Sequence, residues 1–254
     1  MKISIVTLSF NQCAFLREAL ESVLSQKYPD LEYIVVDPGS TDGSRELIQS
    51  YSAAIARIIF EPDRGASDGL RKGFAAATGD IFGFLNSDDL LVDGSLRRVA
   101  EYFETNPDVG LAMGNGHIVD IEGRVVRPVK ARRFTVDRYF YGGTQFLQQS
   151  TFFRREAYLN SPGFDVRNRT CWDGELFVSM VQRGTKVGYI DADLSKFRIH
   201  NQSITGTRGL QNVYYEDHKR IFHDVIGRNW RITDNLWKLV YRGEAALRRA
   251  GIVR

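Results

Sequence analysis

Carboxylate and amide side chains follow each of four short apolar runs in the first 110 residues. The runs lie at residues 3–8, 33–36, 58–60 and 81–85, and the polar side chains that follow them are Ser9 and Asn11, Asp37, Asp63 and Asp68, and Asn86 to Asp89. If the runs are strands of an open α/β sheet, these side chains meet at the edge where ligands bind. Clustered carboxylates suit Mg²⁺ or Mn²⁺, which takes oxygen ligands from the protein and from substrate phosphates. The pattern therefore predicts a metal-dependent site for a phosphate-bearing ligand.

Two familiar phosphate-binding loops are missing from the sequence. A dinucleotide site needs a glycine-rich turn after the first strand, whereas this turn reads Ser9-Phe10-Asn11-Gln12. No G-x-x-x-x-G-K-[ST] segment occurs either. A bound pyrophosphate needs another partner here, and a divalent ion held by carboxylates is the one that the sequence favours.

The spacing of apolar residues predicts the elements that position these side chains. Helical periodicity at 15–24, 47–51 and 70–77 separates the apolar runs, and this alternation predicts a parallel sheet whose strands are buried on both faces. Asn11 is expected to cap the first helix. Beyond residue 110 the sequence predicts a hairpin at 109–129, an irregular mobile segment at 130–150, strands at 151–154 and 186–190, a helix through Leu176, and helical structure from Leu210 onward.

Composition and charge argue against several classes of protein. No window approaches about 18 consecutive apolar residues, so no transmembrane helix is expected, and the first apolar run is too short for a secretory signal. Cys13 and Cys171 are the two cysteines, which make no disulfide framework, and the expected location is the cytoplasm. The net charge of +3 does not argue for nucleic acid as a partner.

The basic residues concentrate at the C-terminal end. Residues 208–254 carry ten Lys and Arg against five Asp and Glu, a net +5, so the preceding residues carry −2. On a helix, apolar and basic side chains of this segment fall on different faces: Leu236, Val240 and Leu247 beside Trp237 on one, and Lys238, Arg242 and Arg249 on another. Such a helix either lies on an anionic membrane surface, as a peripheral contact of a cytoplasmic protein, or packs against the rest of the chain with its charges in water.

Six motifs stand in a fixed order along the chain. They are Ser4-Ile5-Val6-Thr7 with Phe10-Asn11, Val35-Val36-Asp37 with Gly39 to Gly43, Glu61 to Gly65 with Asp68, Ala77 to Asp80 leading to Leu85-Asn86-Ser87-Asp88-Asp89, Trp172 to Leu176, and His200 to Thr205. In order and spacing they resemble family 2 glycosyltransferases with the GT-A fold, over roughly residues 1–205. The resemblance implies an α/β nucleotide-diphospho-sugar transferase fold with a mostly parallel central sheet flanked by helices. It implies a nucleotide-binding half at 1–110, an acceptor-binding half at 111–207, and a basic helical extension at 208–254.

The resemblance also implies a reaction. A single sugar would pass, with inversion, from a nucleotide-sugar, a UDP-sugar, to a hydroxyl of a saccharide or lipid-linked saccharide, in cell-envelope polysaccharide or glycolipid synthesis. The implied cofactor is Mn²⁺ or Mg²⁺. The family's processive synthases carry a Q-x-x-R-W segment and membrane spans, and this sequence shows neither. Two alternatives stay open: a sugar-nucleotide nucleotidyltransferase, which would release pyrophosphate, and a non-catalytic nucleotide-sugar-binding protein, which would bind the donor without turnover.

Ten residues match the family's donor site. They are Thr7, Phe10, Asn11, Asp37, Asp68, Arg71, Lys72, Asn86, Ser87 and Asp88. Thr7 and Asp37 stand at nucleobase positions, and a carboxylate can accept the N3–H of uracil; the competing role of Asp37 is to cap the following turn. Arg71 or Lys72 stands near the diphosphate, unless Asp68 and Lys72 form a surface ion pair at i,i+4.

Metal binding is implied for two residues. Asp88 matches the metal-binding aspartate of the family's D-x-D motif, and His200 stands near the metal or the diphosphate. Asn86 replaces the first aspartate of that motif and can bond a ribose hydroxyl. The competing interpretations are that residues 86–89 cap a helix that begins near Gly94, and that His200 makes a structural hydrogen bond at a strand end.

Asp173 matches the family's catalytic base, which must reach the acceptor hydroxyl. Family members often carry Glu before this residue. Here it is Trp172, which offers an apolar face to a sugar ring, and Gln149 lies where acceptor contacts are expected. Glu175 is the alternative base, and helix capping is the alternative role of Asp173. The polar stretch 201–207 is expected to order over bound donor as a lid.

Overall fold

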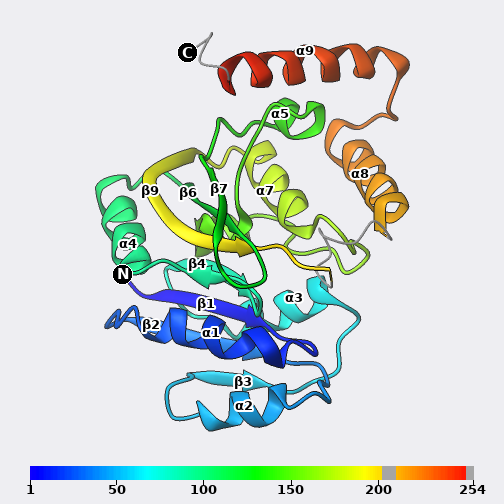
Figure 1. Cartoon of the computed structure of the whole chain (residues 1–254). Coiled ribbons are helices and arrows are strands. Elements are labelled where there is room, and N and C mark those ends of the chain that lie inside the picture. The colour runs from blue at the N-terminus through cyan, green and yellow to red at the C-terminus, as the bar shows by residue number, and fades with distance from the viewer. Residues whose placement is uncertain (202–209, 250–254) are drawn as a thin grey trace.

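The structure, a computed structural model, describes residues 1–201 and 210–249. A curled sheet runs through the molecule between layers of helices (Figure 1). Its strands are β1 Ile3–Leu8, β2 Leu31–Val36, β3 Arg57–Ile59, β4 Ile81–Asn86, β5 Leu90–Leu91, β6 Leu111–Val119, β7 Val125–Val129, β8 Thr151–Arg154 and β9 Val187–Arg198. The helices are α1 Cys13–Leu24, α2 Ser44–Ser50, α3 Ala66–Ala76, α4 Ser95–Thr105, α5 Val136–Tyr141, α6 Arg155–Leu159, α7 Trp172–Gln182, α8 Gln211–Ile226 and α9 Ile232–Arg249, with a 3-10 turn, η1, at Gln148–Ser150.

The sheet is parallel in its first part and mixed in its second. The strand order is β3-β2-β1-β4-β8-β6-β9-β5, with β7 paired to β6. Strands β3, β2, β1 and β4 are parallel, which confirms the prediction from strand–helix alternation. Beyond β4, β8 is antiparallel to β4 and β6, while β9 runs parallel to β6. The carboxyl ends of β1 and β4 therefore lie side by side, as a ligand site requires.

Alternate residues of the first strands pack into two different cores. Ile5 and Tyr33 belong to the core that includes α1 and α4, whereas Val6 and Ile34 belong to the core that includes α3 and α7. All four side chains are at most 1% exposed, and each such buried apolar side chain stabilises the fold by roughly 1.5–3 kcal/mol. The expectation of strands buried on both faces is confirmed.

Two elements differ from the expectation drawn from periodicity. Strand β9 continues to Arg198, because Asp191 and Asp193 lie at outward-facing positions and interrupt the apolar run without ending the strand. Helix α5 lies in the segment expected to be irregular and mobile. The Thr135 hydroxyl caps it by accepting the N–H of Arg138 at 3.2 Å. A helix of six residues is too short to show a 3.6-residue period.

Asn11 does not cap the first helix. Helix α1 begins at Cys13, whose N–H donates to Asp42 Oδ2 at 2.8 Å. The Asn11 side chain instead accepts the N–H of Thr41 at 2.9 Å, with its own backbone at φ 52°. Both contacts join the loop after β1 to the loop after β2, so they shape the edge where the predicted site lies.

The C-terminal helices differ in how they join the molecule. Helix α8 places Ile221 and Phe222, both 0% exposed, in the core shared with α5 and α7. Helix α9 lies on α5 at the outside of the molecule (Figure 1). The expected boundary at 207/208 falls outside the described residues. No helix within the described ranges is long and apolar enough to cross a membrane.

Candidate active site

A cavity of about 800 Å³ opens beyond the carboxyl ends of β1 and β4. Its volume is within the range of pockets that bind small molecules, about 300–1,000 Å³. The sequence-predicted residues that line it are Phe10, Asn86, Ser87, Asp88, Gln149, Trp172 and Asp173. The structure thus brings four of the ten predicted donor residues, both predicted acceptor residues and the predicted base to one cavity, from segments up to 163 positions apart. Asn11, like the other donor residues, is not part of the cavity wall.

Thr7 and Asp37 are fully buried and do not line the cavity. Thr7 Oγ1 lies 3.0 Å from the Tyr33 hydroxyl. Asp37 Oδ1 accepts the N–H groups of Gly39 and Ser40 at 3.0 and 2.8 Å, and Oδ2 accepts the Ser40 hydroxyl at 2.6 Å. Burial opposes ionisation of Asp37, but these hydrogen bonds outweigh it, so its pKa is below the usual value. In this structure Asp37 caps the turn that follows β2.

Asp68 and Lys72 both hold the loop before α3 and do not pair with each other. Asp68, 8% exposed, accepts the N–H of Arg64 at 3.1 Å, and Lys72 donates to the carbonyl of Pro62. Arg71 is exposed and lies outside the cavity wall. The basic side chain of this region that does line the cavity is Arg64, which sequence reasoning missed.

Asp88 and His200 form the one predicted pair that fits a divalent ion. Asp88 Oδ2 lies 3.0 Å from His200 Nε2, and their side chains are 12% and 2% exposed. Two neighbouring ligands of an octahedral ion with bonds of about 2.1 Å lie about 3 Å apart. The His200 ring also packs on Phe15, with 4.6 Å between ring centroids. Residues 1–201 and 210–249 contain no group of three or more His, Cys, Asp or Glu that could hold a metal. An ion here would therefore take its remaining ligands from phosphate and water.

Arg198 and Asp89 fix the backbone around Asp88. Asp89 Oδ1 accepts the N–H of Arg198 at 2.9 Å, and Arg198 donates from Nε to the carbonyl of Asp88 at 3.0 Å and from Nη2 to Glu18 at 2.6 Å. Burial, followed by the charge of Asp88, raises the pKa of Asp89 well above its usual value. The turn at 86–89 does not cap α4, because β5 intervenes and Gly94 occupies the N-cap position.

Asn86 and Gln149 face the cavity from neighbouring elements. Asn86 Nδ2 donates to Asp89 Oδ2 at 3.3 Å. Gln149 is 3% exposed, and its Nε2 makes no hydrogen bond of good geometry within the part of the chain that the structure describes, although its amide is close enough to Asp89 to lower the pKa of that carboxyl in part. An unsatisfied buried amide costs about 1–3 kcal/mol. A ligand oxygen in the cavity would remove that cost, which suits Gln149 to binding a sugar hydroxyl.

Asp173 lies in the first turn of α7 and lines the cavity beside Trp172. Burial raises the pKa of its carboxyl, and the backbone N–H groups of Gly174 and Asp173 oppose this rise only in part. A carboxylate with a raised pKa accepts a proton more readily, so it is a better general base near neutral pH. The N-cap position of α7 belongs to Cys171, so Asp173 lies inside the helix.

Glu175, the alternative base, contacts α8 through Arg220 and is not part of the cavity wall. Arg220 donates to both of its carboxylate oxygens, at 2.7 and 3.0 Å, and Asn168 Nδ2 donates at 2.7 Å. Arg220 also reaches Asp165 at 3.1 Å. These contacts occupy Glu175 in joining α7 to α8, which favours Asp173 as the base.

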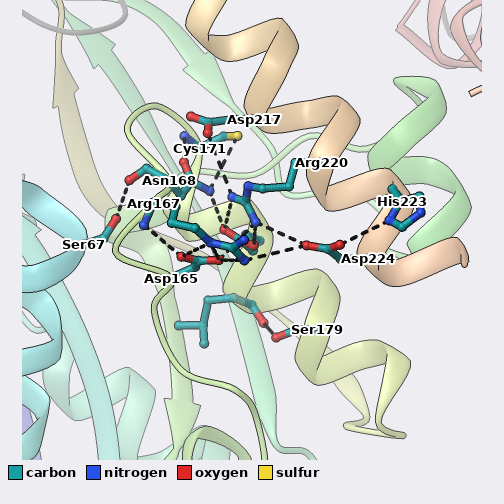
Figure 2. Close-up of polar contacts among 12 residues, drawn as sticks. Ser67, Asp165, Arg167, Asn168, Cys171, Ser179, Asp217, Arg220, His223 and Asp224 are labelled. Carbon is teal, nitrogen blue, oxygen red and sulfur yellow. Dashed lines mark hydrogen bonds and ion pairs between the residues drawn. The ribbon is translucent and has the colours of Figure 1, made fainter. Parts of the chain in front are cut away.

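A second residue of α8 holds the segment that precedes Asp173 (Figure 2). Asp217 accepts the N–H of Arg169 at 3.0 Å and the hydroxyl of Thr170 at 2.7 Å. Arg169 and Thr170 both line the cavity. On the opposite side, Ser67 of α3 donates to the carbonyl of Asn168 at 2.7 Å. The cavity wall next to Asp173 is therefore fixed from α3 and α8 together.

The motif around His200 extends into residues 202–209, which lie outside the described residues. The expected lid at 201–207 is therefore described only at Asn201, which is exposed.

Comparison with known sequences identifies relatives over much of this chain. Residues 4–161 match the sequence profile of the family described as Glycosyl transferase family 2. The chain is 39% identical over 114 residues to an uncharacterized glycosyltransferase of Nostoc sp., covering 44% of this chain and 35% of that one. It is 34% identical over 103 residues to a putative teichuronic acid biosynthesis glycosyltransferase of Bacillus subtilis, covering 39% of this chain and 41% of that one. The matched regions thus span less than half the length of these two relatives.

Solved structures share the fold at low sequence identity. S. aureus TarS 1-349 in complex with UDP-GlcNAc has a TM-score of 0.71 at 16% identity, covering 95% of this chain and 71% of that one. The mannosyltransferase PcManGT from Pyrobaculum calidifontis, in complex with GDP-Man and Mn²⁺, has a TM-score of 0.65 at 18% identity, covering 97% and 69%. Fold and sequence profile agree with each other and with the resemblance drawn from the six motifs. This chain belongs to glycosyltransferase family 2 and has the GT-A fold.

Proposed function

We propose that this chain transfers one sugar, with inversion, from a UDP-sugar to a hydroxyl acceptor, and that the reaction requires Mn²⁺ or Mg²⁺. The observation that carries the proposal is that Asp88, paired with His200, and Asp173 line one cavity at the ends of the parallel strands. Such a transfer needs a metal-binding pair next to the diphosphate on one side of the sugar and a carboxylate that accepts a proton from the acceptor on the other side.

In the proposed reaction Asp173 accepts the proton of the acceptor hydroxyl. The hydroxyl oxygen forms a bond to the anomeric carbon as the bond from that carbon to the diphosphate breaks. Asp88 and His200 would hold the divalent ion, which when bound supplies positive charge next to the leaving diphosphate. Gln149 and Trp172 would hold the acceptor sugar, the first by its unpaired amide and the second by its ring.

Two structurally similar proteins bind different nucleotide-sugars. The complex of TarS with UDP-GlcNAc supports a uridine nucleotide, whereas PcManGT binds GDP-Man. Asp37 is 0% exposed and outside the cavity wall, so it can accept the N3–H of uracil only if the turn after β2, which it caps, moves to expose it. Phe10, 59% exposed in the cavity wall, offers a ring on which a base can stack.

The acceptor side extends into a second cavity of about 420 Å³. The two cavities share Phe146, Leu147 and Phe197 in their walls, and Arg127 and Arg132 line the second one. We place the distal part of a saccharide or lipid-linked saccharide there, and the two guanidinium groups suit an acceptor that carries negative charge. The name of the Bacillus subtilis relative supports a role in cell-envelope polysaccharide synthesis.

A nucleotide-release assay tests this function. A panel of UDP-, GDP- and dTDP-sugars is incubated with the chain and saccharide acceptors, with Mn²⁺ or with EDTA, and wild type is compared with Asp173→Asn. Release of UDP from one donor that EDTA and the substitution both abolish is the expected result. Release of pyrophosphate instead would identify a nucleotidyltransferase. Saturable donor binding by thermal shift, with no release from any donor–acceptor pair, would identify a binding protein.

A further inference from the structure

The side-chain amide of Gln12 is a polar group of the cavity wall that the proposed reaction does not use. Gln12 lines the cavity together with Phe10, and its buried Oε1 has no hydrogen-bond partner among residues 1–201 and 210–249. Gln12 occupies the N-cap position of α1, but its side chain does not cap that helix. A buried acceptor without a partner destabilises the folded chain, and a ligand N–H or O–H group in the cavity would satisfy it.

The loop that carries Gln12 is held by hydrogen bonds on both sides of this residue. The N–H of Asn11 donates to Ser40 Oγ at 2.8 Å, and the N–H of Cys13 donates to Asp42 Oδ2 at 2.8 Å. The carbonyl of Gln12 itself accepts two N–H groups of the first turn of α1. The backbone of Gln12 is thus fixed before a ligand binds, so less conformational freedom is lost on binding.

The carboxylate of Asp37, at a position expected to bind the nucleobase, is occupied by the protein itself. Its Oδ1 accepts the N–H groups of Gly39 and Ser40 at 3.0 and 2.8 Å, and also Arg45 Nε at 3.2 Å. Its Oδ2 accepts the Ser40 hydroxyl at 2.6 Å, and the residue is 0% exposed. Arg45 pairs with its negative charge as well. A base in the cavity therefore needs a different hydrogen-bond partner in this structure.

The arrangement of strands indicates which end of the cavity receives the nucleoside. Asp88 follows β4, which pairs with β1, and β1 pairs with β2 on its other side. Helix α7, which carries Asp173, lies on the side of β4 away from β1 and β2 (Figure 1). With the diphosphate at Asp88 and the sugar at Asp173, the nucleoside extends across the ends of β1 and β2. Phe10, Gln12 and Pro38 follow these strands and line the cavity.

We infer that Gln12 binds the hydrogen-bonding edge of the donor's nucleobase while the face of the base stacks on Phe10. For uracil, Oε1 of Gln12 accepts N3–H and Nε2 donates to the neighbouring O4. The diphosphate presents only acceptor oxygens, so it does not satisfy Oε1. The role of Gln12 rests on the proposed nucleotide-sugar donor, and it adds the residue that distinguishes one base from another.

Titration calorimetry of the full chain with UDP and 3-methyl-UDP, in the presence of Mn²⁺, tests this role. Wild type should bind UDP about tenfold or more tightly than 3-methyl-UDP, which lacks the N3–H group. Gln12→Ala removes the amide and leaves space for the methyl group. This variant should bind UDP about tenfold more weakly than wild type does, and should bind the two ligands with affinities within about twofold of each other.

A second variant should change the preference for the base. In Gln12→Glu one carboxylate oxygen still accepts N3–H of uracil, but the other faces the acceptor O4. The edge of guanine instead presents two donors, N1–H and N2–H, to the same carboxylate. The ratio of the UDP and GDP dissociation constants should therefore shift by about tenfold or more in favour of GDP. Repulsion between the new charge and the diphosphate affects both ligands and cancels in this ratio.

Gln49 supplies the matched control, because it is exposed in α2 and outside the cavity wall. Gln49→Ala and Gln49→Glu should keep both wild-type ratios. Discrimination between UDP and 3-methyl-UDP that persists in Gln12→Ala would overturn the inference and leave the proposed donor standing; weaker binding of both ligands in that variant would assign Gln12 to the ribose. Equal binding of the two ligands by wild type would also overturn it. Absence of UDP and GDP binding by wild type would remove the proposed donor, and the role of Gln12 with it.

Discussion

Asp173 sits where folding and catalysis make opposite demands on one carboxyl group. Burial raises its pKa, which means that the ionised form is less favourable in the folded chain than in water. The same shift makes the group a stronger proton acceptor near neutral pH. A residue that only capped α7 would gain nothing from this environment, since a cap is stabilised by being ionised.

The substitution Asp173→Asn should therefore separate activity from stability. We expect nucleotide release to fall by about 10²–10⁴-fold, the usual contribution of a general base. The free energy of unfolding at pH 7 should stay equal or rise, because the amide avoids the cost of a buried charge. The pKa in the folded chain is above that in the unfolded chain, so this advantage should appear as pH rises through the folded pKa and vanish below the unfolded value, about 3.9. Urea unfolding across pH measures it, and a less stable variant at pH 7 would make Asp173 a structural residue.

The pair of Asp88 and His200 should couple metal binding to nucleotide binding. In wild type, Mn²⁺ and UDP together should raise the thermal midpoint by more than the sum of their separate effects, because phosphate oxygens complete the ligand set. His200→Ala removes one of the two proposed protein ligands, so the affinity for Mn²⁺ in the presence of UDP should fall at least tenfold. At other metal sites, loss of a residue that only hydrogen-bonds to a ligand already lowers metal affinity by about 10–100-fold.

The surface pair of His117 and Asp193 supplies the control for this prediction. Its nitrogen and oxygen lie 3.8 Å apart on side chains that are 26% and 48% exposed. His117→Ala should leave the joint effect of Mn²⁺ and UDP unchanged. Equal behaviour of the two histidine variants would remove His200 from the metal site and leave it as a structural hydrogen-bonding residue.

At the scale of elements, sequence periodicity predicted the strands that are apolar throughout and the helices between them. Periodicity ended β9 too early because the outward-facing Asp191 and Asp193 interrupt its apolar run. It missed α5 because a helix of six residues is too short to show a 3.6-residue period. The cavity residues that lie at strand ends or helix starts, such as Asp88 and Asp173, could be placed from position alone. Arg198 could not, because a buried arginine inside a strand has no local signature and its partners are 109 and 180 residues away.

The cluster between α7 and α8 was hidden from sequence for the same reason. Arg220 and Asp217 are spaced as any helical pair, and their partners at Glu175 and Thr170 lie more than 40 residues earlier. Only the packing of α8 on α7 shows that these side chains hold the segment that carries Asp173. They are positioning residues, since neither lines the cavity.

Replacing Arg220 should therefore affect both stability and activity, while its neighbour on α8 should affect neither. Arg220→Met breaks charged hydrogen bonds to half-buried carboxylates and should lower the free energy of unfolding by about 2 kcal/mol. Lys219→Met removes a pair with Glu216 in which both side chains are more than 60% exposed, and should cost less than about 0.5 kcal/mol.

Urea unfolding and initial rates of nucleotide release measure the two variants at matched, fully folded conditions. A fall in kcat for Arg220→Met, recovered in part by Arg220→Lys, is expected if the cluster positions Asp173. An unchanged kcat in the folded Arg220→Met protein would reduce the cluster to a stabilising role alone.

In the molecule as a whole, α8 and α9 have different structural roles, although both lie in one basic segment of the sequence. Helix α8 completes the main core and fixes the cavity wall through Arg220 and Asp217. Helix α9 rests on α5 at the outside of the molecule and leaves large apolar side chains such as Leu236 and Leu239 exposed. The segment after residue 207, which sequence alone treated as one extension, thus combines a structural helix with a surface helix.

Two truncations should distinguish these roles. A chain that ends at Arg231 loses α9 and should still unfold cooperatively and release nucleotide, with a lower urea midpoint because Asp234, Tyr241 and Glu244 no longer contact α5. A chain that ends at residue 201 loses Ile221 and Phe222 as well, each 0% exposed. Removing side chains of this kind costs roughly 2–5 kcal/mol each, against a total stability of about 5–15 kcal/mol for a typical domain.

The shorter chain should therefore fail to fold cooperatively, which urea unfolding followed by circular dichroism would detect as a broad or missing transition. The loss should exceed that of the chain ending at Arg231 because α8 fills space in the core, whereas α9 packs at the surface on α5 and on the segment with Arg228 and Trp230. A cooperative transition and full nucleotide release from the chain ending at residue 201 would show instead that α8 is separable, and that Asp173 holds its position without the contacts that Arg220 and Asp217 make.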